Sequence, residues 1–148
     1  MSEHRVAIEW SGGSAEFTYD TYPRDHLWTF EGGIEVPATA APDFKGTEGL
    51  VNPEEAFVAS VASCHMLTFL AIAARKRFDV ESYSDSAVGH LEKNDDGKLA
   101  MTRVELSPEI VFGSSAPDKE QLEKLHESAH KNCFIANSVT TSIVVQEP

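Results

Sequence analysis

The stretch NPEEAFVASVASCHMLTFLAIAARKR, from Asn52 to Arg77, decides the fold of this chain. Asn52 is a favourable helix N-cap, and Pro53 suits the first helical position because its missing N–H has no partner inside a helix. Residues 56–74 are apolar or small on nearly every face. A helix of this kind is buried rather than half exposed, so the stretch predicts a long buried central helix with Cys64 near its middle.

A membrane-spanning helix is the alternative interpretation of the same stretch, because about 20 apolar residues suffice to cross a bilayer. Five side chains argue against it by interrupting the run, namely Ser60, Ser63, Cys64, His65 and Thr68. The rest of the chain alternates as a soluble sheet does. We therefore expect a core helix and no membrane partner.

The bulk composition indicates one soluble domain over residues 1–148, with 41% hydrophobic residues for a core. The net charge of −12 argues against binding to nucleic acid, which needs a cationic surface. The polar start MSEHRVAIEW has no apolar segment of a signal peptide. We therefore expect a cytoplasmic protein, in which thiols are kept reduced.

Alternation and turn residues predict the remaining elements. Residues 5–10 and 15–19 form a first predicted hairpin, and residues 80–91 and 99–112 form a second, with Pro108 at an edge or a bulge. Short strands are expected at 26–30, 34–36 and 140–145, and a second helix from Pro117, capped by Ser115 or Ala116. This order predicts an α+β fold, with antiparallel sheets wrapped around the central helix. Because two hairpins cover only part of that helix, we also expect an obligate homodimer in which each subunit covers the helix of the other.

The only two cysteines, Cys64 and Cys133, carry the clearest chemical signal. They fit either small buried hydrophobes or a redox pair whose helix stripes face the same core. The redox reading needs a cation near the reactive sulfur, since an unperturbed thiol is only about 3% ionised at pH 7. Arg24, in an aromatic loop, is the candidate, and a carboxylate is the natural group to hold it.

Three motifs resemble the OsmC/Ohr family of thiol peroxidases: NPEE at 52–55, ASCH at 62–65 and HKNC at 130–133 followed by Asn137-Ser138. YPRDHLWTFEGG, at 22–33, is similar to the N-terminal region of that family. The resemblance implies an intertwined homodimer that reduces organic hydroperoxides in oxidative-stress defence, without a cofactor and with an external dithiol reductant. It implies a peroxidatic Cys64, a resolving Cys133 joined to it in a disulfide, and Arg24 held by Glu54.

Two further expectations accompany this resemblance. Glu54 and Cys64 lie about 15 Å apart along one helix, so we expect Glu54 and Arg24 to reach the Cys64 site from the partner subunit. Phe134 stands where the family usually has proline, so the local geometry of the resolving step and the reductant can differ from those of the family. The candidate apolar walls of the substrate pocket are Trp28, Met66, Leu67 and Phe134.

Two other functions compete with a thiol peroxidase. His126 and His130 lie at i, i+4 on one predicted helix, so with Cys133 and Cys64-His65 they form a candidate zinc site. A non-catalytic protein that binds apolar small molecules, with inert thiols, is the second alternative.

Overall fold

The computed structural model describes residues 1–147, which form two compact parts, residues 1–56 and 57–147. Each part is described by itself below, so the expectation of one domain stays a prediction. Helix α1, Pro53–Arg75, begins in the first part and continues into the second.

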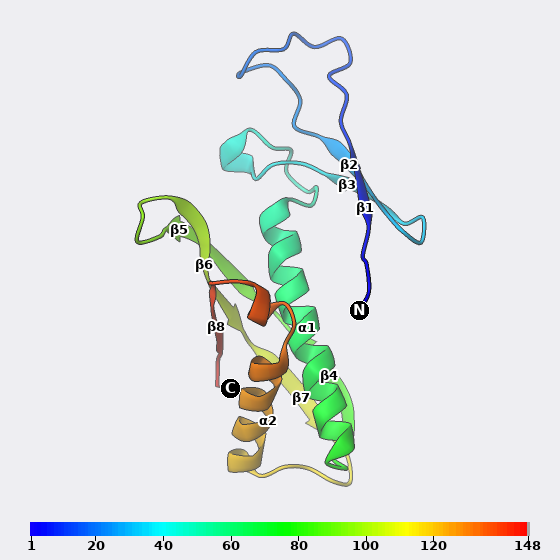
Figure 1. Ribbon diagram of the computed structural model, residues 1–148, viewed down its shortest axis with the longest axis vertical. Helices are drawn as coiled ribbons and strands as arrows, with labels where there is room; N and C mark the ends of the chain where they lie inside the picture. The colour runs from blue at the N-terminus through cyan, green and yellow to red at the C-terminus, as the bar shows by residue number, and fades with distance from the viewer. Residues whose placement is uncertain (148) are drawn as a thin grey trace. The chain divides into compact units, whose positions relative to one another are not determined.

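The first part is a three-stranded antiparallel sheet in the order β1-β2-β3 (Figure 1). Its strands are β1 (Val6–Glu9), β2 (His26–Phe30) and β3 (Glu35–Ala38), and Trp28 of β2 lies between Ile8 and Val36. The predicted hairpin between residues 5–10 and 15–19 is wrong, because β1 pairs with β2 instead.

The segment between β1 and β2 is a loop because its aromatic residues pack on one another instead of alternating across a sheet. The Trp10 indole N–H donates to the carbonyl of Pro23 at 2.7 Å. The rings of Phe17 and Tyr22 lie 6.0 and 6.2 Å from that of Trp10, in edge-to-face arrangements. Phe17, one of the alternating side chains that suggested a strand at 15–19, is thus part of an aromatic cluster instead.

Helix α1 starts as its sequence predicts. The Glu55 N–H donates to the Asn52 side chain at 2.9 Å, and the Asn52 N–H donates to the Glu55 carboxylate at 3.2 Å, which forms a capping box. The helix is long and apolar enough to cross a bilayer by length and composition alone. Within the chain it buries a single stripe of residues, Val61, His65, Phe69 and Ala73.

The prediction that this helix is buried on every face is therefore wrong for the single chain. Ala59, Ser63, Leu67 and Ala71 lie on another face of α1 and are exposed, with Leu67 at 60%. One stripe is buried because the elements of the second part pack on only one side of the helix.

The second part contains two small sheets. One pairs β4 (Val80–Asp85) with β7 (Pro108–Phe112), and the other has the order β5-β6-β8, from β5 (Val88–Lys93), β6 (Leu99–Leu106) and β8 (Ser142–Val145). Each arm of the predicted second hairpin is thus divided between two sheets. Ser107 marks one break, where its N–H donates to Asp85 at 2.7 Å. Pro108 opens an edge strand, which is one of the two positions expected for it.

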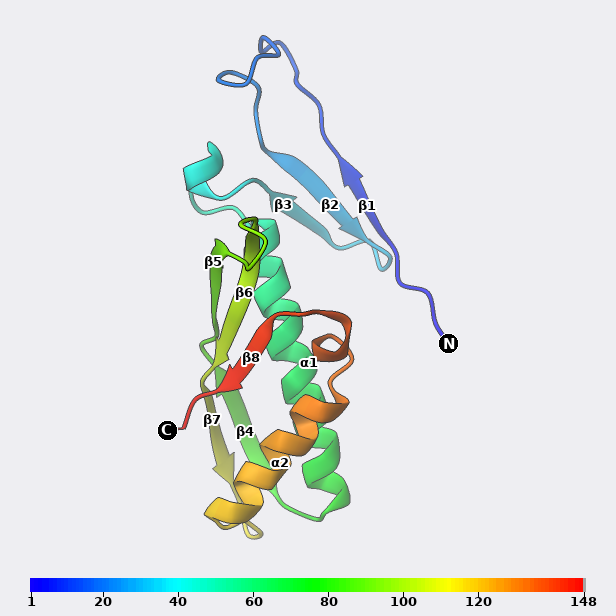
Figure 2. The same ribbon diagram turned by 60° about the vertical axis from the view of Figure 1, so that its left-hand side comes forward.

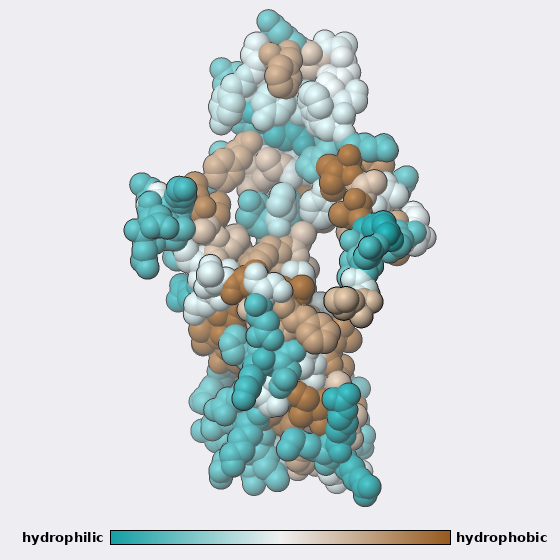
Figure 3. Space-filling view, in the orientation of Figure 1, coloured by the Kyte–Doolittle hydropathy of each residue, from teal (hydrophilic) through white to brown (hydrophobic). Residues whose placement is uncertain are grey.

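Helix α2, Lys119–Asn132, begins two residues later than predicted. Asp118 is the N-cap rather than Ser115 or Ala116, because it forms a capping box with Gln121. The helix ends at Cys133, and a 3₁₀ turn, Ala136–Ser138, leads toward β8. The visible face over α2 is mostly hydrophilic (Figure 3).

Two apolar clusters fix α1 in the second part. Phe69 and Ala73 of α1 pack with Leu125 and Ala129 of α2, against half-buried residues of β4 and β7. Val61 packs with Val104 and Leu106 of β6, joined by half-buried residues from the end of α2 to β8, namely Ile135, Ile143 and Val145. Figure 2 shows α2 alongside the C-terminal half of α1. The α+β class predicted from the sequence is confirmed.

Candidate active site

The two cysteines meet in the second part of the chain. Helix α1 presents a half-buried Cys64, and Cys133 lies 1% exposed at the end of α2. Ile135 packs on Val61, one turn before Cys64, and so brings the end of α2 against α1. Both thiols are free, and each side chain lies near enough to shift the pKa of the other.

The environment of Cys64 favours its thiolate. Partial burial by itself raises the pKa of Cys64, but hydrogen bonds outweigh this effect and lower it overall. The donors, in decreasing order, are the peptide N–H of Ile135, the Cys133 thiol and the peptide N–H of Phe134. The Thr68 hydroxyl donates to the carbonyl oxygen of Cys64 at 2.8 Å, so its proton is committed to the backbone.

Cys133 is shifted in the opposite direction. Burial raises the pKa of Cys133, and the hydrogen bond and charge of Cys64 raise it further, although the N–H of Ala136 partly offsets them at 3.5 Å from the sulfur. A lower pKa at Cys64 than at Cys133 is the order that a nucleophile and its resolving thiol require.

Arg24 lies in the first part, in the loop before β2. Its guanidinium donates to the carbonyl oxygens of Tyr22 and Tyr19 and stacks 3.5 Å from the centre of the Tyr22 ring. Within residues 1–147 it forms no ion pair with a carboxylate, and no hydrogen bond joins it to Glu54. The backbone and an aromatic ring therefore hold this arginine in place of the expected carboxylate.

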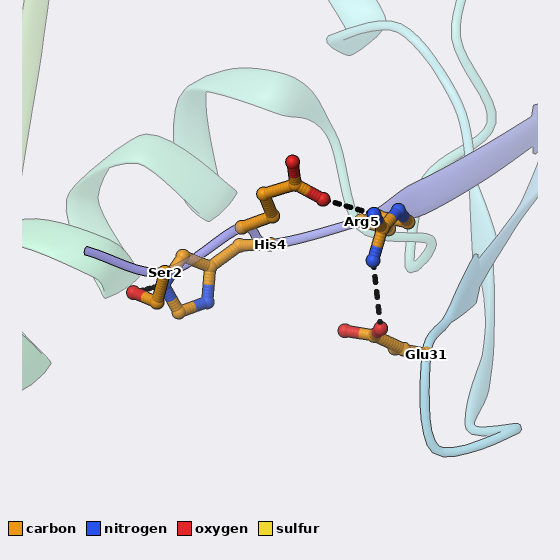
Figure 4. A network of polar contacts seen from close by, with 5 residues as sticks. Ser2, His4, Arg5 and Glu31 are labelled. Carbon is orange, nitrogen blue, oxygen red and sulfur yellow. Dashed lines mark hydrogen bonds and ion pairs between the residues drawn. The ribbon is translucent and has the colours of Figure 1, made fainter.

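Arg5 is the other arginine of the first part, and its contacts are ion pairs on the surface. It forms ion pairs with Glu3 and, at 3.4 Å, with Glu31 at the end of β2, and Ser2 bonds to His4 beside it (Figure 4). All three charged side chains are exposed, so these pairs contribute little to stability.

Glu54 lies in the first turn of α1, and its oxygen Oε2 is buried without a hydrogen-bond partner among the described residues. A buried carboxylate oxygen that accepts no hydrogen bond is costly. Glu54 therefore has an open acceptor, although Arg24 does not fill it in the single chain.

The predicted pocket walls divide between the two parts. Trp28 is half-buried in β2, with its ring 6.1 Å from that of His26. Met66 is half-buried on α1, and Leu67 and Phe134 are exposed, at 60% and 80%. A cavity of about 440 Å³ does occur in the first part, lined by Trp10, Phe17, Tyr22, Pro23, Arg24, His26, Thr39, Ala40 and Pro53.

The predicted zinc ligands are not gathered into one site. Among residues 1–147, no three side chains of His, Cys, Asp or Glu are grouped so as to hold a metal ion. His126 turns instead toward His65, with Nδ1 and Nε2 3.0 Å apart and the rings stacked at 9°. The i, i+4 spacing of His126 and His130 fails as a metal signal because His126 faces the core and His130 is exposed.

The histidine stack and the peptide donors near Cys64 were both missed by sequence reasoning. A histidine at 65, inside an apolar helix, was the only sign of the stack. The peptide donors have no sequence signal, because every residue except proline carries an N–H.

Comparisons with known proteins identify the family of this chain. A family model described as OsmC-like protein matches residues 46–147. An OsmC-like protein of unknown function from Vibrio cholerae is 51% identical, with 99% of each chain covered and a TM-score of 0.94. An organic hydroperoxide resistance protein from Legionella pneumophila is 18% identical (99% of this chain, 98% of that chain, TM-score 0.73). One from Elizabethkingia anophelis is 17% identical (100% and 98%, TM-score 0.74). No curated protein matches the sequence.

Proposed function

Because the chain belongs to the OsmC-like protein family, we propose that it is a thiol-dependent peroxidase that reduces organic hydroperoxides to alcohols. The observation that carries the proposal is the meeting of two free cysteines, Cys64 with a lowered pKa and Cys133 with a raised pKa, each of which acts on the other. The names of the Legionella and Elizabethkingia proteins favour a hydroperoxide as the substrate class.

The proposed reaction has three steps. The Cys64 thiolate attacks the distal oxygen of the hydroperoxide, the O–O bond breaks, and the alkoxide takes a proton and leaves as the alcohol. The sulfur is then a sulfenic acid, which the Cys133 thiol attacks to form a disulfide and release water. An external dithiol reduces this disulfide to two thiols, so no bound cofactor is needed.

Arg24 and Glu54 complete the proposed site as contributions from a second copy of the chain. Glu54 offers a buried acceptor without a partner, and Arg24 retains guanidinium N–H groups beyond the two that contact its own loop. The exposed face of α1, which includes Leu67, is the surface that the homodimer would cover. Light scattering at micromolar concentration tests this assembly, and a stable monomer would contradict it.

The proposed reaction is tested by stopped-flow consumption of cumene hydroperoxide with a dithiol as the reductant. Cys64→Ser should abolish turnover. Cys133→Ser should consume one equivalent of peroxide and then stop, because its sulfenic acid has no partner thiol. Turnover that persists unchanged in Cys64→Ser would refute the thiol mechanism.

A further inference from the structure

A pair of histidine rings joins the two helices that carry the thiols. His65 of α1 and His126 of α2 approach each other through Nε2 and Nδ1, which lie 3.0 Å apart, and the two rings lie at 9° to each other. In the part of the chain that the structure describes, this is the one hydrogen bond between α1 and α2. Apolar contacts around Phe69 complete the packing of the two helices.

The second ring nitrogen of His65 indicates the direction of this hydrogen bond. His65 is 1% exposed, and its Nδ1 has no hydrogen-bond partner among residues 1–147. A buried N–H without an acceptor is rarer in proteins than a buried acceptor without a donor. His65 therefore keeps its proton on Nε2 and donates it to Nδ1 of His126, and the half-buried His126 keeps its own proton on Nε2.

The His126 ring also fits between two side chains of α1. Its centre lies 5.3 Å from that of His65 and 4.6 Å from that of Phe69, and these two residues are one helical turn apart. Apolar packing has no preferred direction, whereas a hydrogen bond weakens steeply when its angle changes. The histidine pair is therefore suited to fix how α2 is rotated about its own axis.

Cys133 comes level with the other thiol because of where the end of α2 meets α1. His126 contacts α1 at His65, and Ile135 packs on Val61 one turn earlier. Cys133 lies between these two contacts along the chain, and it follows His126 by seven residues, which places both on one face of α2. Side chains lie about 5 Å from a helix axis, so a rotation of α2 by about 20° would displace this sulfur by about 2 Å.

We propose that the hydrogen-bonded His65 and His126 are a positioning pair, which holds Cys133 where it can attack Cys64. This inference rests on the proposed function, because it concerns the second step of that reaction. In that step the Cys133 thiol attacks the sulfur of the Cys64 sulfenic acid, the S–S bond forms, the S–O bond breaks, and water leaves with the thiol proton. A small displacement of one reacting atom slows such a step strongly. Neither ring takes part in the chemistry.

Exchange with dithiobis(nitrobenzoic acid) at pH 8 tests the proposal without peroxide. Cys64, the more exposed thiol, displaces one thionitrobenzoate and forms a mixed disulfide; Cys133 then attacks the Cys64 sulfur and releases the second thionitrobenzoate. The two releases are followed by absorbance as separate phases. His126→Leu removes the hydrogen bond and keeps a side chain of similar size. It should slow the second release about tenfold and leave the first unchanged.

A conservative variant separates the hydrogen bond from the bulk of the ring. The side-chain oxygen of asparagine can replace Nδ1 of histidine as an acceptor, so His126→Asn should restore the fast second release. His130→Leu, the same substitution at an exposed position of α2, is the matched control and should leave both phases unchanged. An unchanged second release in His126→Leu, or an equal loss in His126→Asn, would overturn the proposal. A first release slowed as much as the second would overturn it too.

A measurement on the wild type decides the question if a variant fails to fold. In isotope-labelled protein at pH 8, NMR should show a scalar coupling between Nε2 of His65 and Nδ1 of His126 across their hydrogen bond, and its absence would overturn the proposal. Neither the exchange reaction nor this coupling involves peroxide. The positioning pair can therefore fail while the peroxidase stands, and peroxide reduction can fail while the positioning pair stands.

Discussion

Acid should destabilise this protein through His65. Its ring is 1% exposed, stacks on His126 and lies one residue from Cys64. His126 in turn packs against Phe69, with ring centres 4.6 Å apart, and both His126 and His130 disfavour a charge on His65. Protonation would place a charge in this apolar cluster without a carboxylate to balance it.

The magnitude follows from the difference between the folded and unfolded states. Burial first, and then His126 and His130, lower the pKa of His65 from 6.5 to about 4. Between these values the unfolded chain binds the proton and the folded chain does not, so stability falls as the pH drops below 6.5 and stops falling near 4. The loss is about 2 kcal/mol between pH 7 and pH 5, and about 3 kcal/mol once complete.

Urea unfolding at pH 5, 6 and 7, at one protein concentration, measures this effect. The free energy of unfolding should fall by about 2 kcal/mol more in the wild type than in His65→Leu, which cannot titrate at this position. His4→Gln, which removes an exposed histidine, is the matched control. Asp85, whose pKa burial raises, gives the opposite slope, but it contributes equally to both proteins. Parallel pH dependences in the wild type and His65→Leu would refute the reasoning.

Two further predictions concern the site and the packing. Arg24→Ala should move the pH profile of Cys64 alkylation to higher pH if a guanidinium assists the thiolate, and an unchanged profile would show that this arginine has no part in activation. Gly89→Ala should lower the free energy of unfolding by about 1 to 3 kcal/mol, because its added methyl would lie 2.4 Å from a side chain of α1 and 2.6 Å from one of β6. Gly32→Ala, where the methyl would meet nothing within 4 Å, is the control, and equal losses would contradict the packing argument.

Sequence patterns predicted the structure correctly where a few neighbouring residues decide it. Asn52 and Pro53 indicated the start of α1, and the alternation on either side of residues 92–98 indicated that the chain turns back there, as it does between β5 and β6. The prediction of a strand at 15–19 was wrong because of tertiary packing. An alternating sequence pattern does not distinguish a side chain that packs on Trp10, as Phe17 does, from one on a sheet. The prediction of a single hairpin from residues 80–91 and 99–112 was wrong for a similar reason, since the pairing of strands depends on residues far apart in the sequence.

By itself, the sequence determined the α+β class, the position of α1, and Cys64 and Cys133 as the residues to examine. These features follow from composition, capping and periodicity, which act over a few residues. Tertiary structure alone decided that His126 turns to His65 rather than to a metal, and that Arg24 rests on tyrosine carbonyls. Hydrogen-bond geometry depends on where distant backbone segments meet, and residue identity does not specify that.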